Sequence, residues 1–230
     1  MYCPACKSER LESTRPGTKV VDFVCPDCRE PFQLKSQGRP LRARISDAAY
    51  EPMISSVRTS TAPTFLFLEY HPSRWCVRNL VLVGRHFLTP SVVERRPPLR
   101  QSARRAGWVG CNIMLSAVPP DARIHVVRAE VPTPPEAVRS SWRKFEFLRA
   151  ADSESRGWMA DVLTCIRELR RDSFALEDIY AFESRLKKFH SQNRYVRPKI
   201  RQQLQVLRDH GIIEFVGRGE YRILLMPQQE

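Results

Sequence analysis

Three short runs of apolar residues in the amino-terminal two-thirds of the chain have the length and composition of strands. The run at 64–70 is continuous and partly aromatic, which is typical of a strand buried on both faces. Runs at 79–83 and 123–127 predict two further strands. Pro134 and Pro135 suit the start of a helix, which we expect to continue to about residue 148. These elements together predict a mixed α/β (α+β) fold for this part of the chain.

Weaker patterns lie before and between these runs. Apolar residues recur at helical spacing over 45–58, which predicts a helix with a kink at Pro52. Residues 36–44 and 94–112 are basic and rich in turn residues, so we expect loops there.

The carboxyl-terminal third follows a different pattern, with amphipathic helices and one hairpin. Trp158 recurs with Val162, Ile166 and Leu169 at helical spacing, and we interpret it as a core residue. A second helix is predicted over 176–186, with Ser173 as its cap, and a third over 195–208, ended by Gly211. Two short strands at 212–216 and 221–224 flank a turn at 217–219. Three helices before a hairpin with a basic tip is the order of a winged helix.

The change of pattern falls in a polar stretch, 151–157, which predicts a domain boundary. We therefore expect one domain over 1–153 and a second over 154–230. Residues 158–230 carry 13 basic and 10 acidic residues, so most of the net charge of +13 lies in the first domain.

Composition and charge narrow the class of protein. Hydrophobic residues make up 42% of the chain, which is typical of a globular protein. The sequence pI of about 9.9 makes a polyanion the expected partner, and nucleic acid is the commonest one. A membrane surface is the alternative, but the chain has neither a transmembrane run nor a basic amphipathic helix with an aromatic face. Because the start also lacks a signal pattern, we expect a cytoplasmic protein.

Four cysteines predict a structural zinc site. Cys3, Cys6, Cys25 and Cys28 form two Cys-x-x-Cys pairs with 18 residues between them. Each pair places two thiolates on one tight turn, and two turns can close a tetrahedron around Zn²⁺. Reduced thiols in the cytoplasm favour a metal over disulfides. The remaining cysteines, at 76, 111 and 165, are interpreted as core residues.

A second set of residues, D-x10-Q-x-K, resembles the PD-(D/E)xK nuclease motif, and this resemblance implies phosphodiester hydrolysis. Asp22 would lie at the end of one strand, with Gln33 and Lys35 on one side of the next strand because side chains alternate. The Asp22 carboxylate, the Gln33 amide oxygen and the Leu34 carbonyl could hold Mg²⁺, which prefers oxygen ligands. Lys35 would position the attacking water and offset developing charge. The alternative is a solvated strand face, which this spacing alone does not exclude.

Long stretches of the chain resemble the DpnI-type restriction endonucleases, which cut methylated DNA. The similarity covers nearly the whole chain, at 22–23, 33–36, 103–113, 155–158, 199–209, 214–215 and 217–219. The resemblance implies a PD-(D/E)xK nuclease core with a zinc-binding insertion, followed by a winged helix. It also implies a bacterial enzyme that cleaves double-stranded DNA at GATC sites with N6-methyladenine. The family pattern has Glu where this chain has Gln33, so Mg²⁺ binding is expected to be weaker.

Three segments carry the side chains expected to contact DNA: a helix, the wing and a loop. Gln can bond adenine bidentately and Arg can bond guanine or phosphate, so the third helix of the winged helix suits the major groove. In the first domain, a large aromatic in a basic loop could stack on a base or pack on an added methyl group. The alternatives are a solvated helix face and a core tryptophan. The expected contacts are Arg197, Lys199, Arg201, Gln202, Gln203 and Gln205 on the helix, Arg218 on the wing, and Arg104, Arg105 and Trp108 in the loop.

The sequence leaves two functions open. The first is a Mg²⁺-dependent, methyl-directed type II restriction endonuclease. The second is a non-catalytic or weakly catalytic methyl-DNA-binding protein, in which Gln33 marks lost activity. Lys35 discriminates between them, because a reader has no need for a lysine two residues after Gln33. No protein partner is indicated, and a monomer is the simplest expectation.

Overall fold

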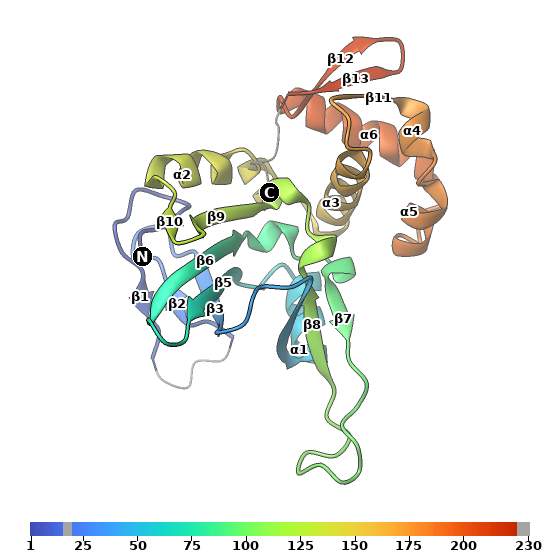
Figure 1. Cartoon of the computed structure of the whole chain (residues 1–230). Helices are drawn as coiled ribbons and strands as arrows, with labels where there is room; N and C mark the ends of the chain where they lie inside the picture. The colour runs from blue at the N-terminus through green and yellow to red at the C-terminus, as the bar shows by residue number, and fades with distance from the viewer. Residues whose placement is uncertain (16–19, 225–230) are drawn as a thin grey trace.

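The three predicted strands lie together in one large mixed sheet (Figure 1). In the computed structural model, which describes residues 1–15 and 20–224, this sheet has seven strands in the order β1-β2-β3-β5-β6-β9-β10. Its neighbours pair antiparallel except for β3 and β5, which run parallel. The strands are β1 (Glu12–Ser13), β2 (Phe23–Val24), β3 (Pro31–Gln37), β5 (Thr64–His71), β6 (Cys76–Val83), β9 (Arg123–Arg128) and β10 (Val131–Pro132).

The two faces of this sheet pack against different elements. Phe32 of β3 lies in a buried cluster with Leu66 and with Trp142 of α2 (Pro135–Arg143). Figure 1 shows α2 lying across that face, and a 3-10 turn, η5 (Glu146–Ala150), follows it. Phe65 and Phe67 of β5 belong to the other buried cluster. Because side chains alternate along a strand, Gln33 and Lys35 lie on the face opposite α2.

That opposite face is covered by a second, smaller sheet and a helix. The second sheet has the order β4-β8-β7, all antiparallel. It consists of β4 (Arg44–Ala49), β7 (Val93–Arg95) and β8 (Gly110–Met114), and it packs with α1 (Tyr50–Arg58). Four 3-10 turns connect these elements: η1 (Arg85–Phe87), η2 (Pro90–Val92), η3 (Leu115–Ala117) and η4 (Pro120–Ala122).

The predicted helix over 45–58 is wrong in its first part. Residues 44–49 form β4, because their backbone groups pair with β8. The helix α1 begins only at Tyr50, so Pro52 lies in its first turn, where the missing N–H needs no partner and no kink results. Likewise the ends of the predicted loop at 94–112 belong to β7 and β8. The loop between them extends far from the body of the molecule in Figure 1.

The carboxyl-terminal part is a winged helix, as the order of its elements predicts. The sheet order β11-β13-β12 places the hairpin next to the short first strand. Gly219 has a φ of +76°, which suits glycine at the tip of the wing. The elements are α3 (Ser153–Glu168), β11 (Ser173–Ala175), α4 (Leu176–Tyr180), α5 (Glu183–Phe189), α6 (Val196–Asp209), β12 (Ile213–Gly217) and β13 (Glu220–Ile223).

Two details of this part differ from the prediction. The second predicted helix is divided into α4 and α5, and Ser173 lies in β11 instead of capping the helix. The Asp178 carboxylate accepts a hydrogen bond from the Ala175 N–H at 2.9 Å and so satisfies the start of α4. Trp158 is fully buried in α3, which confirms it as a packing residue. Among the described residues, no helix has the length and apolar character needed to span a membrane.

Candidate metal centres and nucleic-acid interface

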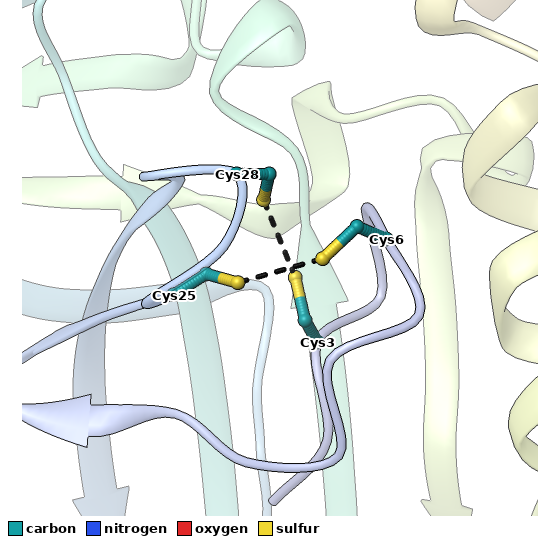
Figure 2. A group of neighbouring side chains, drawn as sticks. All are labelled: Cys3, Cys6, Cys25 and Cys28. Atoms are coloured by element: carbon teal, nitrogen blue, oxygen red, sulfur yellow. Dashed lines mark hydrogen bonds between the residues drawn. The ribbon is translucent and has the colours of Figure 1, made fainter.

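The four predicted zinc ligands converge on one point. Figure 2 shows all four thiols directed toward one another from two loops, one before β1 and one after β2. The Sγ atoms of Cys3 and Cys28 are 3.7 Å apart, those of Cys6 and Cys25 are 3.5 Å apart, and all four lie within 4.8 Å of one another. A tetrahedron with Zn–S bonds of about 2.3 Å has S···S edges of about 3.8 Å. The site therefore matches the size of a closed four-cysteine site that could hold a metal such as zinc.

The surroundings of these thiols tie the site to the sheet. Cys3 and Cys25 are fully buried in the cluster that contains Phe32. The Arg139 guanidinium of α2 donates a hydrogen bond to the Cys3 carbonyl at 3.2 Å. Burial raises the pKa of the Cys25 thiol, but hydrogen bonds from the backbone of Cys28 and Asp27 outweigh this and lower it to about 7. A metal at this site would thus hold the first loop against both β3 and α2.

Asp22 lies beside the backbone of β3. It directly precedes β2, and its N–H donates to the Phe32 carbonyl at 2.9 Å. The Asp22 Oδ2 accepts a hydrogen bond from the Leu34 N–H at 2.8 Å. The N–H and C=O of one strand residue point to the same side of the strand, so the Leu34 carbonyl also faces the Asp22 edge. The structure therefore brings two of the three predicted Mg²⁺ ligands to the same edge of β3.

Gln33 is buried, with 7% of its surface exposed. Its Oε1 atom makes no hydrogen bond among the described residues. A buried amide oxygen without a partner costs free energy, about 1–3 kcal/mol in typical proteins. Such an atom is available for a ligand that supplies positive charge, and a cation is the simplest one.

Lys35 forms an ion pair that the sequence analysis missed. Its Nζ contacts the Oδ1 of Asp47 in β4, and the Asp47 side chain is fully buried. On the other side of the Asp47 carboxylate, the Cys111 Sγ lies 3.9 Å from Oδ2. Asp47 was overlooked because residues 45–58 were predicted to be helical, which hid the strand that places it opposite β3. In the sequence, Asp47 is marked only by its position: it is an acidic residue with an apolar residue two places away on each side, as on one face of a strand.

The loop between β7 and β8, which we call the β7–β8 arm (residues 96–109), carries the basic and aromatic residues predicted to contact DNA. Arg104 and Arg105 are exposed, and Trp108 is half-buried. The Arg105 guanidinium lies over the Trp108 ring, 4.8 Å from its centroid. Hydrogen bonds of 2.9 and 3.0 Å join Leu99 to Trp108 and Gly107 across the arm. Trp108 is thus part of the arm and is not a core residue.

Helix α6 exposes only part of the predicted set. Arg197, Arg201, Gln202 and Gln205 are exposed, and Lys199 is half-buried. Gln203 is different, because only 3% of its surface is exposed. It shares the buried face of α6 with Ile200, Leu204 and Leu207, so it is not available for a base contact.

The exposed residues of α6 have neighbours on other elements. The Arg197 Nε contacts Glu183 at 2.7 Å, and the Arg201 guanidinium donates to the Tyr180 hydroxyl at 2.6 Å. Arg218 is exposed between the two strands of the wing. A hollow of about 220 Å³ separates α6 from the wing, lined by Arg201, Leu204, Gln205, Arg208, Phe215 and Tyr221.

Two protein-family comparisons match nearly the whole chain. Residues 1–151 match the DpnI model, described as the Dam-replacing family, and residues 154–223 match its C-terminal companion, described as the Dam-replacing HTH domain. The chain belongs to the DpnI family. Membership in the DpnI family implies a restriction endonuclease, a hydrolase that acts on DNA, and it assigns DNA binding to the winged helix. The resemblance inferred from the sequence is thereby confirmed.

Proposed function

We propose that this member of the DpnI family cleaves double-stranded DNA at GATC sites whose adenine carries an N6-methyl group, by Mg²⁺-dependent hydrolysis. The observation that carries the proposal is the arrangement on β3. Asp22 is hydrogen-bonded to the backbone of Leu34. Leu34 lies between Gln33 and Lys35, whose side chains are on one face of the strand.

The proposed Mg²⁺ ligands are the Asp22 carboxylate, the Gln33 Oε1 and the Leu34 carbonyl. All three are hard oxygen atoms, which suit this cation. The unpartnered Oε1 of buried Gln33 supports the assignment, because a cation there would satisfy it. When bound, Mg²⁺ supplies a Lewis acid for the scissile phosphate.

Lys35 has the proposed role of holding the attacking water and stabilising the charge that develops on the phosphate. The water loses one proton as its oxygen forms a bond to phosphorus, and the bond from phosphorus to one sugar oxygen breaks as that oxygen takes up a proton. Asp47 is proposed as a positioning residue, because its buried carboxylate contacts the Lys35 Nζ and limits where the ammonium can lie. A lysine held in this way loses less entropy when it meets the phosphate.

Methyl recognition is assigned to two elements, the β7–β8 arm and the winged helix. Burying one methyl group contributes about 0.8 kcal/mol, roughly a four-fold preference, so a single contact discriminates weakly. In the arm, the Trp108 ring offers an apolar surface. In the winged helix, the hollow beside Gln205 and Phe215 could take a methyl from the major groove. If both elements contact methyl groups of the same site, their preferences for methylated DNA multiply.

The catalytic assignment is tested by Asp22→Ala and Lys35→Ala in the full chain. Each should lower the cleavage rate by about a hundred-fold or more, because each removes charge stabilisation at the phosphate. Affinity for the methylated duplex, measured without Mg²⁺, should change little. Cleavage by Lys35→Ala at the wild-type rate would show that the catalytic residues lie elsewhere.

One observation favours a second candidate function. Gln33 supplies no negative charge, which suits a methyl-DNA-binding protein with weak or no cleavage. Incubation of the wild-type protein with methylated DNA and Mg²⁺ distinguishes the two functions, since a methyl-DNA-binding protein binds the DNA and leaves it intact. Zinc as the metal of the four-cysteine site, the bacterial cytoplasm as location and a monomeric state stay predictions.

A further inference from the structure

A cavity of about 580 Å³ lies next to Lys35. Its walls are the second half of β3, the loop that follows and the start of β4. Arginines and a lysine line it, and none of its described lining residues is acidic. We call it the β3–β4 groove, and its cationic lining residues are Lys35, Arg39, Arg42 and Arg44.

The loop that carries two of these arginines, residues 38–43, is held in place by specific contacts. The Gln37 Nε2 donates to the carbonyls of Arg39 and Pro40 at 3.0 and 2.9 Å. The Leu41 N–H donates at 3.1 Å to Glu69, whose side chain is buried. Gly38 approaches Pro72 so closely that a Cβ would lie 2.7 Å from the proline Cγ. The arginines therefore extend from an ordered backbone, which reduces the entropy lost on binding.

Within the residues that the structure describes, two of the four cations have an acidic partner and two do not. Lys35 is paired with Asp47, and Arg44 lies 3.1 Å from Glu94. Arg39 and Arg42 are exposed, and in the part of the chain that the structure describes neither forms an ion pair. The two unpaired arginines lie beside Lys35, which we propose acts at the scissile phosphate. This arrangement favours an anionic ligand that carries negative charges at regular intervals along its length.

We propose that the β3–β4 groove binds the phosphodiester backbone of the DNA strand next to the scissile phosphate, through Arg39 and Arg42. The inference rests on the proposed function, since Lys35 defines where the scissile phosphate lies. Contacts to phosphate position a duplex and carry no sequence information. The groove therefore adds affinity equally for methylated and unmethylated sites, while the β7–β8 arm and α6 distinguish them.

The test compares the full-length wild type with Arg39→Gln/Arg42→Gln on methylated and unmethylated GATC duplexes without Mg²⁺. The matched control is Arg143→Gln/Lys144→Gln, which removes the same charge from the last residue of α2 and the residue after it, on the other face of the sheet. Binding is measured over a range of salt concentrations, because each phosphate contact contributes about 0.9 to the slope of log K against log salt.

We expect the slope of the Arg39/Arg42 variant to fall by about 2, with equal weakening on both duplexes, and the slope of the control to stay near the wild-type value. An unchanged slope, or a fall no larger than in the control, would overturn the proposal. So would a loss confined to the methylated duplex, because that would make these arginines base readers. If the wild type binds DNA and does not cut it, the proposed function fails, but the slope still decides on the groove.

Discussion

At the scale of single residues, Gln33 gives the prediction with the clearest consequence. Its amide oxygen is buried and unpartnered at the proposed Mg²⁺ site, where a carboxylate would add a negative ligand. We predict that Gln33→Glu lowers the Mg²⁺ concentration for half-maximal cleavage by several-fold. Without Mg²⁺ the same variant should unfold more easily, by about 1–3 kcal/mol, because the new charge is buried without a partner. Cleavage rates over a Mg²⁺ titration, with urea unfolding in parallel, measure both effects. A half-maximal concentration that stays equal or rises would place the metal elsewhere.

Asp47 gives a second prediction at this scale. Asp47→Asn keeps the size of the side chain and removes the charge that holds the Lys35 ammonium, so cleavage should fall by at least about ten-fold. Affinity for DNA without Mg²⁺ should remain near the wild-type value. The control is Glu51→Gln on α1, an exposed residue with the same change of charge. Single-turnover cleavage of the two variants separates them, and equal rates would remove Asp47 from the site.

At the scale of elements, the sequence predicts the helices and strands that nearby residues alone determine. The strands β5, β6 and β9, helices α2, α3 and α6 and the wing follow from apolar spacing and turn residues. The strand β4 was not predicted, because its short alternation can equally be read as a weak helix, and only pairing with β8 decides it. For the same reason, the sequence does not predict Asp47 as a site residue. Gln203 could have been placed correctly, since Ile200, Leu204 and Leu207 define the buried face of α6 that includes it.

The two cysteine loops allow a prediction about metal removal. The strands next to these loops, β1 and β2, have only two residues each, so a bound ion should supply much of the stability of the loops. We predict about one zinc per chain, and a large drop in thermal stability of residues 1–151 when a chelator removes it. Cys25→Ser should give insoluble protein or protein that lacks the metal and does not cleave. Metal analysis with unfolding curves checks this, and a metal-free protein with unchanged stability and activity would contradict it.

At the scale of the whole molecule, the nuclease part and the winged helix each carry basic elements that we propose contact DNA. The nuclease part has the β7–β8 arm and the β3–β4 groove, and the winged helix has α6 and its wing. Buried Asp161 of α3 links the two parts, accepting a hydrogen bond from Ser91 at 3.2 Å and pairing with His190 at 2.9 Å. We propose that both parts contact one DNA site, and that this site is cut only when its adenines carry N6-methyl groups.

Digestion of one DNA fragment in two methylation states tests that claim most directly. The fragment contains a single GATC site, either N6-methylated on both strands or unmethylated, and is incubated with the zinc-loaded wild type and Mg²⁺. We expect cleavage at the methylated site, little or none at the unmethylated site, and none of either by Asp22→Ala. Equal cleavage of the two fragments would contradict the methyl-directed specificity, and intact methylated DNA under conditions where the protein binds it would contradict the nuclease itself.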